Sequence, residues 1–205
     1  MKICLCSLRD PAPQILERLY ETLPPVRRAE VARCRRAALR AAKTVGFHLV
    51  YHAARQLRPD LPLADWQIAE GGKPSLLFAE LHFSLSHTDV CVAAALDKTR
   101  PVGLDIEIVR EHPARFAARF FSPEEQALVA ASPAPADELT RLWTAKEAVV
   151  KESGRGLSIR DLPAISTTGV AGTFFECAGA RHALSLSPCD GLPSLEWVDI
   201  ADLVP

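Results

Sequence analysis

The chain has 205 residues, and at about 150 residues per domain this length fits one ordinary domain or two small domains in contact. Its composition of 48% hydrophobic and 24% charged residues is that of a globular protein, which excludes a disordered or fibrous chain. The 24 basic and 25 acidic residues give a formal net charge of -1. A broad nucleic-acid-binding surface is therefore excluded, and any basic site is local.

Cellular location and thiol state follow from the apolar runs and the cysteines. The longest apolar runs, such as residues 90–96, are far shorter than the roughly 20 residues needed to cross a bilayer, so no membrane partner is expected. The start, MKICLCSLRDPAP, interrupts its apolar run with Arg9 and Asp10, unlike a signal sequence, which favours a cytoplasmic protein. The six cysteines form no CxxC pair, which indicates reduced, mostly buried thiols.

The first half of the chain predicts one long helix followed by strands. Residues 26–57 lack proline and are rich in Ala, Leu and Arg, which predicts the longest helix, with a break near Gly46. The segments WQIAEGGKPSLL, LHFSLSH and VCVAAAL predict short strands separated by GGKP and HTD turns. Residues 102–109, VGLDIEIV, predict a further strand.

The second half mixes helices and strands. The segment SPEE, from Ser122, predicts a capping box at the start of a short helix. A longer helix is predicted over residues 137–153, with Asp137 as its N-cap and Gly154 just beyond its end. From Leu157 onward, HALSLS and SLEWVDI predict antiparallel strands. Because strands and helices do not alternate strictly, the pattern favours the α+β class over a doubly wound parallel sheet.

Two acids on the strand at residues 102–109 form the first candidate site. Asp105 and Glu107 are two residues apart, so their side chains leave the same face of the strand, about 6.6 Å apart along it. The alternate positions hold apolar side chains that can pack into the core, which leaves the two acids facing outward: Leu104, Ile106 and Ile108. By itself the pair is equally well explained by solvated acids, or by acids paired with arginine.

A third acid lies in LWTAKEAVVKESGRGL. Glu147 and Lys151 are four residues apart and share one helical face, which an ordinary surface ion pair would also explain. Three carboxylates gathered without a cation would repel one another, whereas Mg²⁺ accepts oxygen ligands and leaves sites open for phosphate oxygens. The set therefore indicates metal-assisted phosphate chemistry.

Several further segments could contact phosphate. GGKPSL offers Lys73 and Pro74 to a flat or anionic ligand, although a plain exposed turn explains it too. Ser86 and His87 end a strand and could donate hydrogen bonds to phosphate, or act only as polar caps. The long helix carries basic residues that could hold another phosphate or form a solvated face: Arg33, Arg35, Arg36, Arg40 and Lys43.

Taken in order, GKP, FSLSH, VGLDIE, RFFSPEE and LWTAKEAVVKESGRGL resemble the Sfp-type 4'-phosphopantetheinyl transferases. The family pairs a G-x-D-x-E strand with a W-x-x-K-E-x-x-x-K helix, and both motifs stand here without gaps. The matching residues are Gly103, Asp105, Glu107, Trp143, Lys146, Glu147 and Lys151. The likeness covers residues 72–157 and fades toward both ends of the chain.

The resemblance implies a monomer of two similar α+β halves, residues 1–101 and 102–205, related by a pseudo-twofold axis. Coenzyme A and Mg²⁺ would bind in the cleft between the halves. Asp105, Glu107 and Glu147 would hold Mg²⁺ against the coenzyme A diphosphate, and Lys151 would neutralise the same diphosphate. The remaining assignments by resemblance are Ser86 and His87 to coenzyme A phosphates, Lys73 and Pro74 to the adenine, and Arg36, Arg40 or Lys43 to the 3'-phosphate.

The implied reaction is transfer of the 4'-phosphopantetheine arm of coenzyme A to a serine of an acyl or peptidyl carrier protein, releasing adenosine 3',5'-bisphosphate. Glu147 is the candidate base for the serine proton, directly or through water. Two other functions remain open, a non-catalytic coenzyme A or nucleotide-binding module and a Mg²⁺-dependent phosphohydrolase. The sequence decides neither the carrier protein nor Mg²⁺ against Mn²⁺.

Overall fold

The computed structural model describes residues 1–64, 66–68, 73–76, 81–154 and 161–205. The fold is α+β, as predicted. The helices are α1 (Pro13–Glu21), α2 (Pro25–Ala32), α3 (Ala37–Leu57), α4 (Ala114–Phe120), α5 (Pro123–Ala131) and α6 (Pro135–Ser153), with short 3-10 turns η1 (Leu162–Ala164) and η2 (Ile200–Leu203). The strands are β1 (Lys2–Ser7), β2 (Trp66–Ile68), β3 (Pro74–Leu76), β4 (His82–His87), β5 (Cys91–Asp97), β6 (Gly103–Ile108), β7 (Ala171–Cys177), β8 (Ala180–Ser187) and β9 (Leu195–Trp197).

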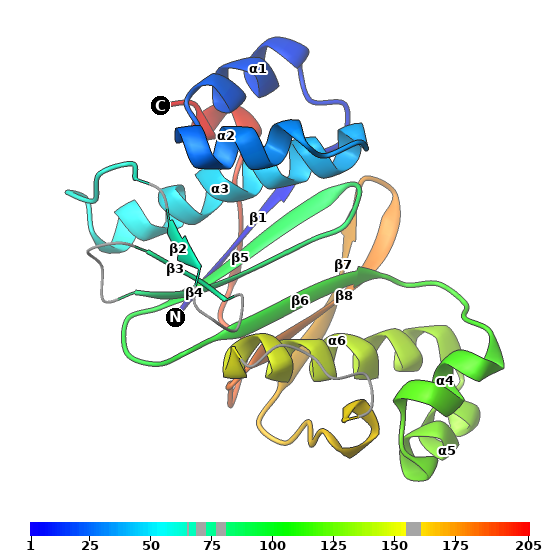
Figure 1. Ribbon diagram of the computed structural model, residues 1–205. Coiled ribbons are helices and arrows are strands. Elements are labelled where there is room, and N and C mark those ends of the chain that lie inside the picture. The colour runs from blue at the N-terminus through cyan, green and yellow to red at the C-terminus, as the bar shows by residue number, and fades with distance from the viewer. Residues whose placement is uncertain (65, 69–72, 77–80, 155–160) are drawn as a thin grey trace.

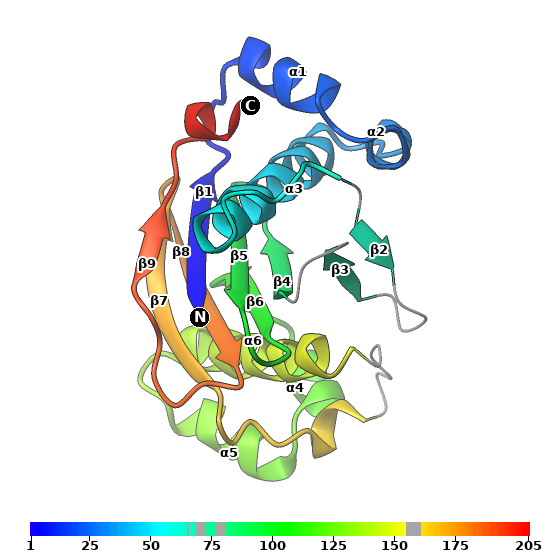
Figure 2. The same cartoon turned by 90° about the vertical axis from the view of Figure 1, so that its left-hand side faces the viewer.

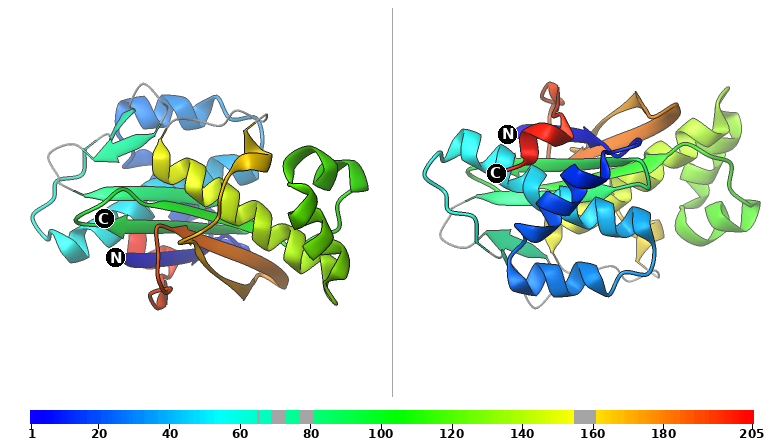
Figure 3. Two further views of the ribbon diagram at one scale, coloured as in Figure 1. Left: turned by 90° about the horizontal axis from the view of Figure 1, so that it is seen from below. Right: turned by 90° about the horizontal axis from the view of Figure 1, so that it is seen from above.

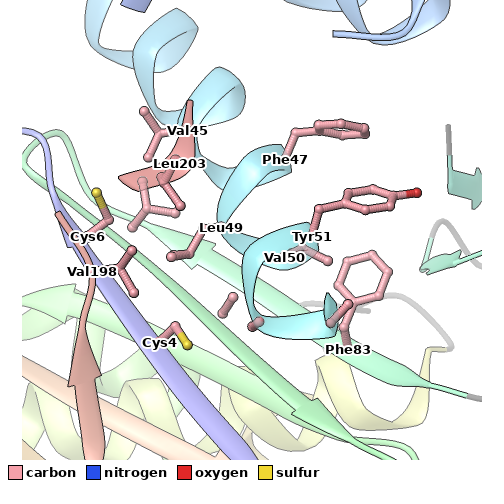
Figure 4. Close-up of a cluster of buried hydrophobic side chains, with 14 of the residues drawn as sticks. Cys4, Cys6, Val45, Phe47, Leu49, Val50, Tyr51, Phe83, Val198 and Leu203 are labelled. Carbon is pink, nitrogen blue, oxygen red and sulfur yellow. The ribbon is translucent and has the colours of Figure 1, made fainter. Parts of the chain in front are cut away.

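Two sheets pack between α3 and α6 (Figures 1 and 2). The first sheet has the order β4-β5-β1-β9, and the second has the order β6-β8-β7. Strand β1 is buried on both faces because its side chains alternate between two cores. Cys4 and Cys6 belong to the core under α3, while Ile3 and Leu5 belong to the core between the sheets. Figure 4 shows the first of these cores, with Cys4 and Cys6 on β1 facing the side chains of α3.

The second sheet turns one face to the first sheet and the other to α6. Leu104 and Ile106 of β6 and Leu184 and Leu186 of β8 fill the core between the sheets. Helix α6 runs across the opposite face of this sheet, and α4 and α5 gather at one end of α6 (Figure 3). The site residues of β6 therefore lie beneath α6.

The strand predictions are confirmed for β2 to β6 and for the antiparallel pair β7 and β8. Part of the expected GGKP turn, residues 71 and 72, lies outside the described residues. The prediction for the final strand is wrong in direction, because β9 pairs with β1 in parallel. The alternation of polar and apolar residues shows that a strand exists, but its partner is chosen by tertiary packing, which brings the end of the chain back to β1.

The predicted long helix is two helices, and the break lies at residues 33–36, not near Gly46. No proline or glycine marks this break. It is produced by tertiary packing, in which Val31 of α2 and Ala42 of α3 join the same core from helices with different directions. Gly46 lies inside α3, and a Cβ there would meet Cδ2 of Leu85 at 2.9 Å. This glycine thus serves close packing of α3 on β4.

The helix ends are partly as predicted. The capping box is confirmed, since Ser122 Oγ accepts from the Glu125 amide at 3.3 Å and Glu125 Oε2 accepts from the Ser122 amide at 2.8 Å. Gly154 ends α6 with φ 66°. However, α6 begins at Pro135, so Asp137 lies in its first turn and is not the N-cap. Proline at the first helical position has the φ that the helix requires, which starts the helix two residues early.

Two composition-based predictions were also tested. All six cysteines are free thiols, and five of them are buried. Within the described part of the chain, none of the helices is long and apolar enough to span a membrane.

Candidate active site

Asp105 lies at the centre of the candidate site and is buried, with 4% of its surface exposed. The expectation that it faces outward is wrong, because α6 covers its face of β6. Its Oδ1 accepts from Lys151 Nζ at 2.6 Å and from Ser86 Oγ at 2.8 Å. Lys151, on the last turn of α6, thus pairs with the strand carboxylate. The site joins one side chain each from β4, β6 and α6.

Gly103 explains how α6 comes this close to β6. A Cβ at this position would lie 1.8 Å from the Ala148 carbonyl oxygen and 2.4 Å from the Glu152 amide nitrogen, both in the α6 backbone. Because Gly103 and Asp105 are two residues apart, they share the strand face toward α6. The absence of a side chain at Gly103 therefore lets Lys151 reach Asp105.

Ser86 and Ser84 join the two sheets where β4 lies beside β6. Ser84 Oγ accepts from the Leu104 amide at 2.9 Å, and Ser86 Oγ accepts from the Ile106 amide at 3.2 Å. Ser86 also receives a hydrogen bond from Lys151 at 3.0 Å. Its hydroxyl thus fixes both the strand register and the position of Asp105. The sequence analysis did not predict this structural role of Ser86.

The remaining carboxylates lie close enough to influence Asp105 electrostatically. Burial, and secondarily the charge of Asp105, raise the pKa of Glu107 and the pKa of Glu147 above the ordinary glutamate value. The charge of Lys151 acts in the opposite direction on both pKa values. The site therefore carries more negative charge than its single lysine relieves.

The site has features that suit a divalent cation, although the side chains do not form a ready ligand set. In the part of the chain described here, no group of three or more His, Cys, Asp or Glu side chains is arranged to hold a metal ion. Yet Asp105 Oδ2 is buried without a hydrogen-bond partner among the described residues. A buried carboxylate oxygen without a hydrogen-bond partner costs free energy. A divalent cation, which prefers oxygen ligands, would remove that cost and offset the negative charges of Glu107 and Glu147. The donor set thus fits Mg²⁺ in chemistry.

A cavity of about 270 Å³ opens among residues of α2, α3, β2, β3 and β4. Three of the residues predicted to contact the ligand line it: Lys43, Pro74 and His87. Burial, and then the charges of Lys151 and Lys43, lower the pKa of His87 below the ordinary histidine value. His87 therefore lies within electrostatic range of Lys151 and Lys43, and its lowered pKa favours the neutral imidazole at pH 7.

Other predicted residues have different surroundings. Arg36 makes a bidentate ion pair with Asp89, at 2.6 and 2.7 Å. Arg40 lines a separate cavity of about 500 Å³ between α1 and α3. Lys73 Nζ donates to the carbonyl oxygens of Val102 and Glu152, at 3.1 and 2.8 Å, so it connects β3 to the end of α6. Among the three basic residues proposed for the 3'-phosphate, only Lys43 lines the cavity with His87.

Sequence reasoning missed the other residues that line the cavity, among them Arg27, Glu30 and Trp66. The Arg27 guanidinium lies 5.3 Å from the centre of the Trp66 ring, over its face. Trp66 also packs against Phe47 and Phe83, with ring centres 5.1 and 5.2 Å away. The pair of arginines that follows Pro24 and Pro25 could have indicated a further basic site in the sequence. Only the turn between α2 and α3 brings Arg27 to the cavity.

Lys146, the first lysine of the helix motif, is fully buried and does not line the cavity. Its Nζ donates to the Leu162 carbonyl at 2.7 Å and pairs with Glu125 Oε1 at 2.9 Å. The other oxygen of Glu125 completes the capping box of α5. Lys146 thus ties α5 and η1 to α6, one residue before Glu147.

The structure combines an α+β fold, a buried carboxylate paired with Lys151 and a cavity lined by Arg27 and Lys43, and sequence comparison identifies its family. Residues 101–186 match the sequence model of the 4'-phosphopantetheinyl transferase superfamily. A 4'-phosphopantetheinyl transferase of Bacillus subtilis is 37% identical over 95 residues, 45% of this chain and 42% of that protein. The 4'-phosphopantetheinyl transferase Sfp of B. subtilis strain 168 is 33% identical over 109 residues, 52% of this chain and 48% of Sfp.

The 4'-phosphopantetheinyl transferase AcpT of Salmonella typhimurium is 34% identical over 138 residues, 64% of this chain and 70% of AcpT. The chain therefore belongs to the 4'-phosphopantetheinyl transferase superfamily, and the resemblance seen in its motifs is confirmed. The matched part covers less than half the length of each of the two Bacillus proteins.

Proposed function

We propose that this protein transfers the 4'-phosphopantetheine arm of coenzyme A to a serine of an acyl or peptidyl carrier protein, with Mg²⁺, and releases adenosine 3',5'-bisphosphate. The observation that carries the proposal is Asp105. Its carboxylate is buried, is held through one oxygen by Lys151 and Ser86, and keeps its other oxygen unpaired among the described residues. A cation and a diphosphate satisfy such a site better than water does.

The carboxylates serve two purposes, metal binding and proton transfer. Asp105, Glu107 and Glu147 would hold the metal ion, which supplies positive charge to the diphosphate oxygens when bound. Glu147 would also take the proton from the carrier serine hydroxyl, directly or through water. The serine oxygen then forms a bond to the β-phosphorus, and the bond from that phosphorus to the bridging oxygen breaks. Lys151 would neutralise the charge that develops on this leaving oxygen.

The cavity would take the nucleotide end of coenzyme A. Lys43 and Arg27 supply two positive charges for the 3'-phosphate, in preference to Arg36 and Arg40, which face Asp89 and the other cavity. Pro74 offers an apolar surface for the adenine. We assign Ser86 and His87 to the coenzyme A phosphates, which a hydroxyl and an imidazole can orient through hydrogen bonds.

We also infer that the protein is a cytoplasmic monomer of two related halves, residues 1–101 and 102–205, arranged about a pseudo-twofold axis. The strand order supports the relation between the two halves. In the first sheet β4-β5-β1 and in the second sheet β7-β8-β6, a hairpin pairs through its second strand with the first strand of the half. Each three-strand unit also carries one long helix, α3 or α6 (Figure 1).

Intact-mass analysis of a panel of apo carrier proteins, incubated with the protein, coenzyme A and Mg²⁺, tests the proposal. We expect at least one carrier to gain the phosphopantetheine arm. Glu147→Gln should slow the transfer by about 100-fold or more while coenzyme A still binds. Glu138→Gln is the matched control on the same helix, because Glu138 forms its ion pair with Arg141 within the described part of the chain.

The two alternative functions give different results in the same experiment. A non-catalytic binder retains coenzyme A but modifies none of the carriers. A phosphohydrolase releases adenosine 3',5'-bisphosphate when no carrier is present. Either result, or a wild-type rate in Glu147→Gln, contradicts the proposal.

A further inference from the structure

Glu30 occupies the place where the cavity would receive a phosphate. It lines the cavity on α2, one turn after Arg27 and opposite Lys43 of α3. Its Oε2 accepts from Arg27 Nη1, and its Oε1 accepts from Lys43 Nζ at 2.6 Å. The two oxygens of one carboxylate thus bridge the two cations that the proposed function assigns to the 3'-phosphate.

The bridge is a strong internal interaction. Arg27 is largely covered, with 13% of its side chain exposed, while 34% of Lys43 and 40% of Glu30 are exposed. Burial alone would raise the pKa of Glu30, but the hydrogen bond from Lys43 and the charge of Arg27 hold it below the ordinary glutamate value. Glu30 is therefore ionised at neutral pH and neutralises one of the two positive charges.

A carboxylate with this geometry resembles part of a phosphate group. Both groups present two oxygens to a pair of cations, and both favour bidentate charge-assisted hydrogen bonds. The Arg27 guanidinium also lies over the Trp66 ring, 5.3 Å from its centre, which favours its present position. A ligand phosphate that reaches the two cations has to share or displace the Glu30 carboxylate, which repels it.

We propose that Glu30 is an internal competitor for the ligand phosphate, and that it sets how strongly the cavity prefers a ligand with a 3'-phosphate over one without it. This inference rests on the proposed function, because that function supplies the phosphate. Glu30 acts as a specificity-determining residue and does not touch the reacting atoms. Removal of its charge strengthens binding of the ligand that carries a 3'-phosphate and leaves binding of the ligand without a 3'-phosphate unaffected.

Two nucleotides that differ by one phosphate test the proposal. Adenosine 3',5'-bisphosphate and adenosine 5'-monophosphate are titrated by calorimetry into the wild-type protein and into Glu30→Gln. We expect Glu30→Gln to bind the bisphosphate about five-fold more tightly, the effect of one partly exposed charge. The affinity for the monophosphate should stay within about two-fold. The salt dependence of bisphosphate binding should also become steeper, since one more positive charge is available.

Matched variants separate a local effect from a change in net charge or shape. Glu17→Gln, an exposed acid on α1 outside this cavity, alters the net charge equally and should leave both affinities unchanged. Glu30→Ala should reproduce the gain of Glu30→Gln, because the gain comes from the lost charge. If Glu30 only positions the two cations, both Glu30 variants bind the bisphosphate less tightly, and the inference is overturned.

The outcomes also separate this inference from the proposed function. Wild-type protein that binds neither nucleotide overturns both. Wild-type protein that prefers the bisphosphate, with the same preference in Glu30→Gln, overturns only the role of Glu30.

Discussion

Gly103→Ala should weaken both the fold and the site through a single methyl group. The new Cβ would lie 1.8 Å from the Ala148 carbonyl oxygen, 2.4 Å from the Glu152 amide nitrogen and 2.9 Å from the Ala148 carbonyl carbon. All three atoms belong to the backbone of α6, so rotation of a flexible side chain cannot relieve the clash. The helix would have to retreat from β6 by more than about 1 Å to restore ordinary contact.

The expected cost follows from this geometry. Extra methyl groups in packed interiors cost about 1–3 kcal/mol, and the rigid backbone partner here favours the upper end, about 3 kcal/mol. For a chain of this length, such a loss lowers the melting temperature by about 6–12 °C. Because α6 carries Glu147 and Lys151, its retreat also separates Lys151 from Asp105 and lowers the transfer rate of the folded protein.

Urea unfolding followed by tryptophan fluorescence measures the stability, and carrier modification followed by mass measures the rate. Gly191→Ala is the control, because a Cβ there meets no described atom within 4 Å. Its free energy of unfolding should stay within about 0.5 kcal/mol of the wild-type value. If Gly103→Ala unfolds at the same urea concentration as Gly191→Ala, the close approach of α6 to β6 is refuted.

Three further predictions concern other parts of the site. Lys146→Met should lower the free energy of unfolding by about 3 kcal/mol in urea titrations, since it leaves Glu125 without its buried partner; an unchanged urea midpoint would rule out a structural role. Mg²⁺ should raise the melting temperature of the wild-type protein in thermal scans but not that of Asp105→Asn, and equal shifts in both would place the metal elsewhere. Because His87 is neutral in the free protein, a ligand phosphate should raise its pKa and draw in a proton. Calorimetry should then show that His87→Gln loses part of the gain in coenzyme A affinity that the wild type shows between about pH 8 and pH 6; equal pH profiles would exclude this protonation.

Local sequence patterns determined most of the secondary structure and the strand face shared by Asp105 and Glu107. The alternation in VGLDIE predicted strand β6 and put Asp105 and Glu107 on one face, because side-chain direction in a strand has a period of two. The SPEE segment predicted the capping box of α5, since its hydrogen bonds connect residues only three positions apart. These features need no information about distant parts of the chain.

Features that depend on distant contacts were decided by the tertiary structure. Sequence alternation identified the two faces of β6, but only the packing of α6 against Gly103 buried Asp105 and directed Lys151 to it. Likewise, the sequence did not distinguish which of the five basic residues on the predicted helix could contact a phosphate. The turn between α2 and α3 brought Lys43 and Arg27 to one cavity and left Arg40 at another. A sequence fixes which charges a helix carries, whereas the direction of each helix depends on how all the apolar faces of the chain are buried together.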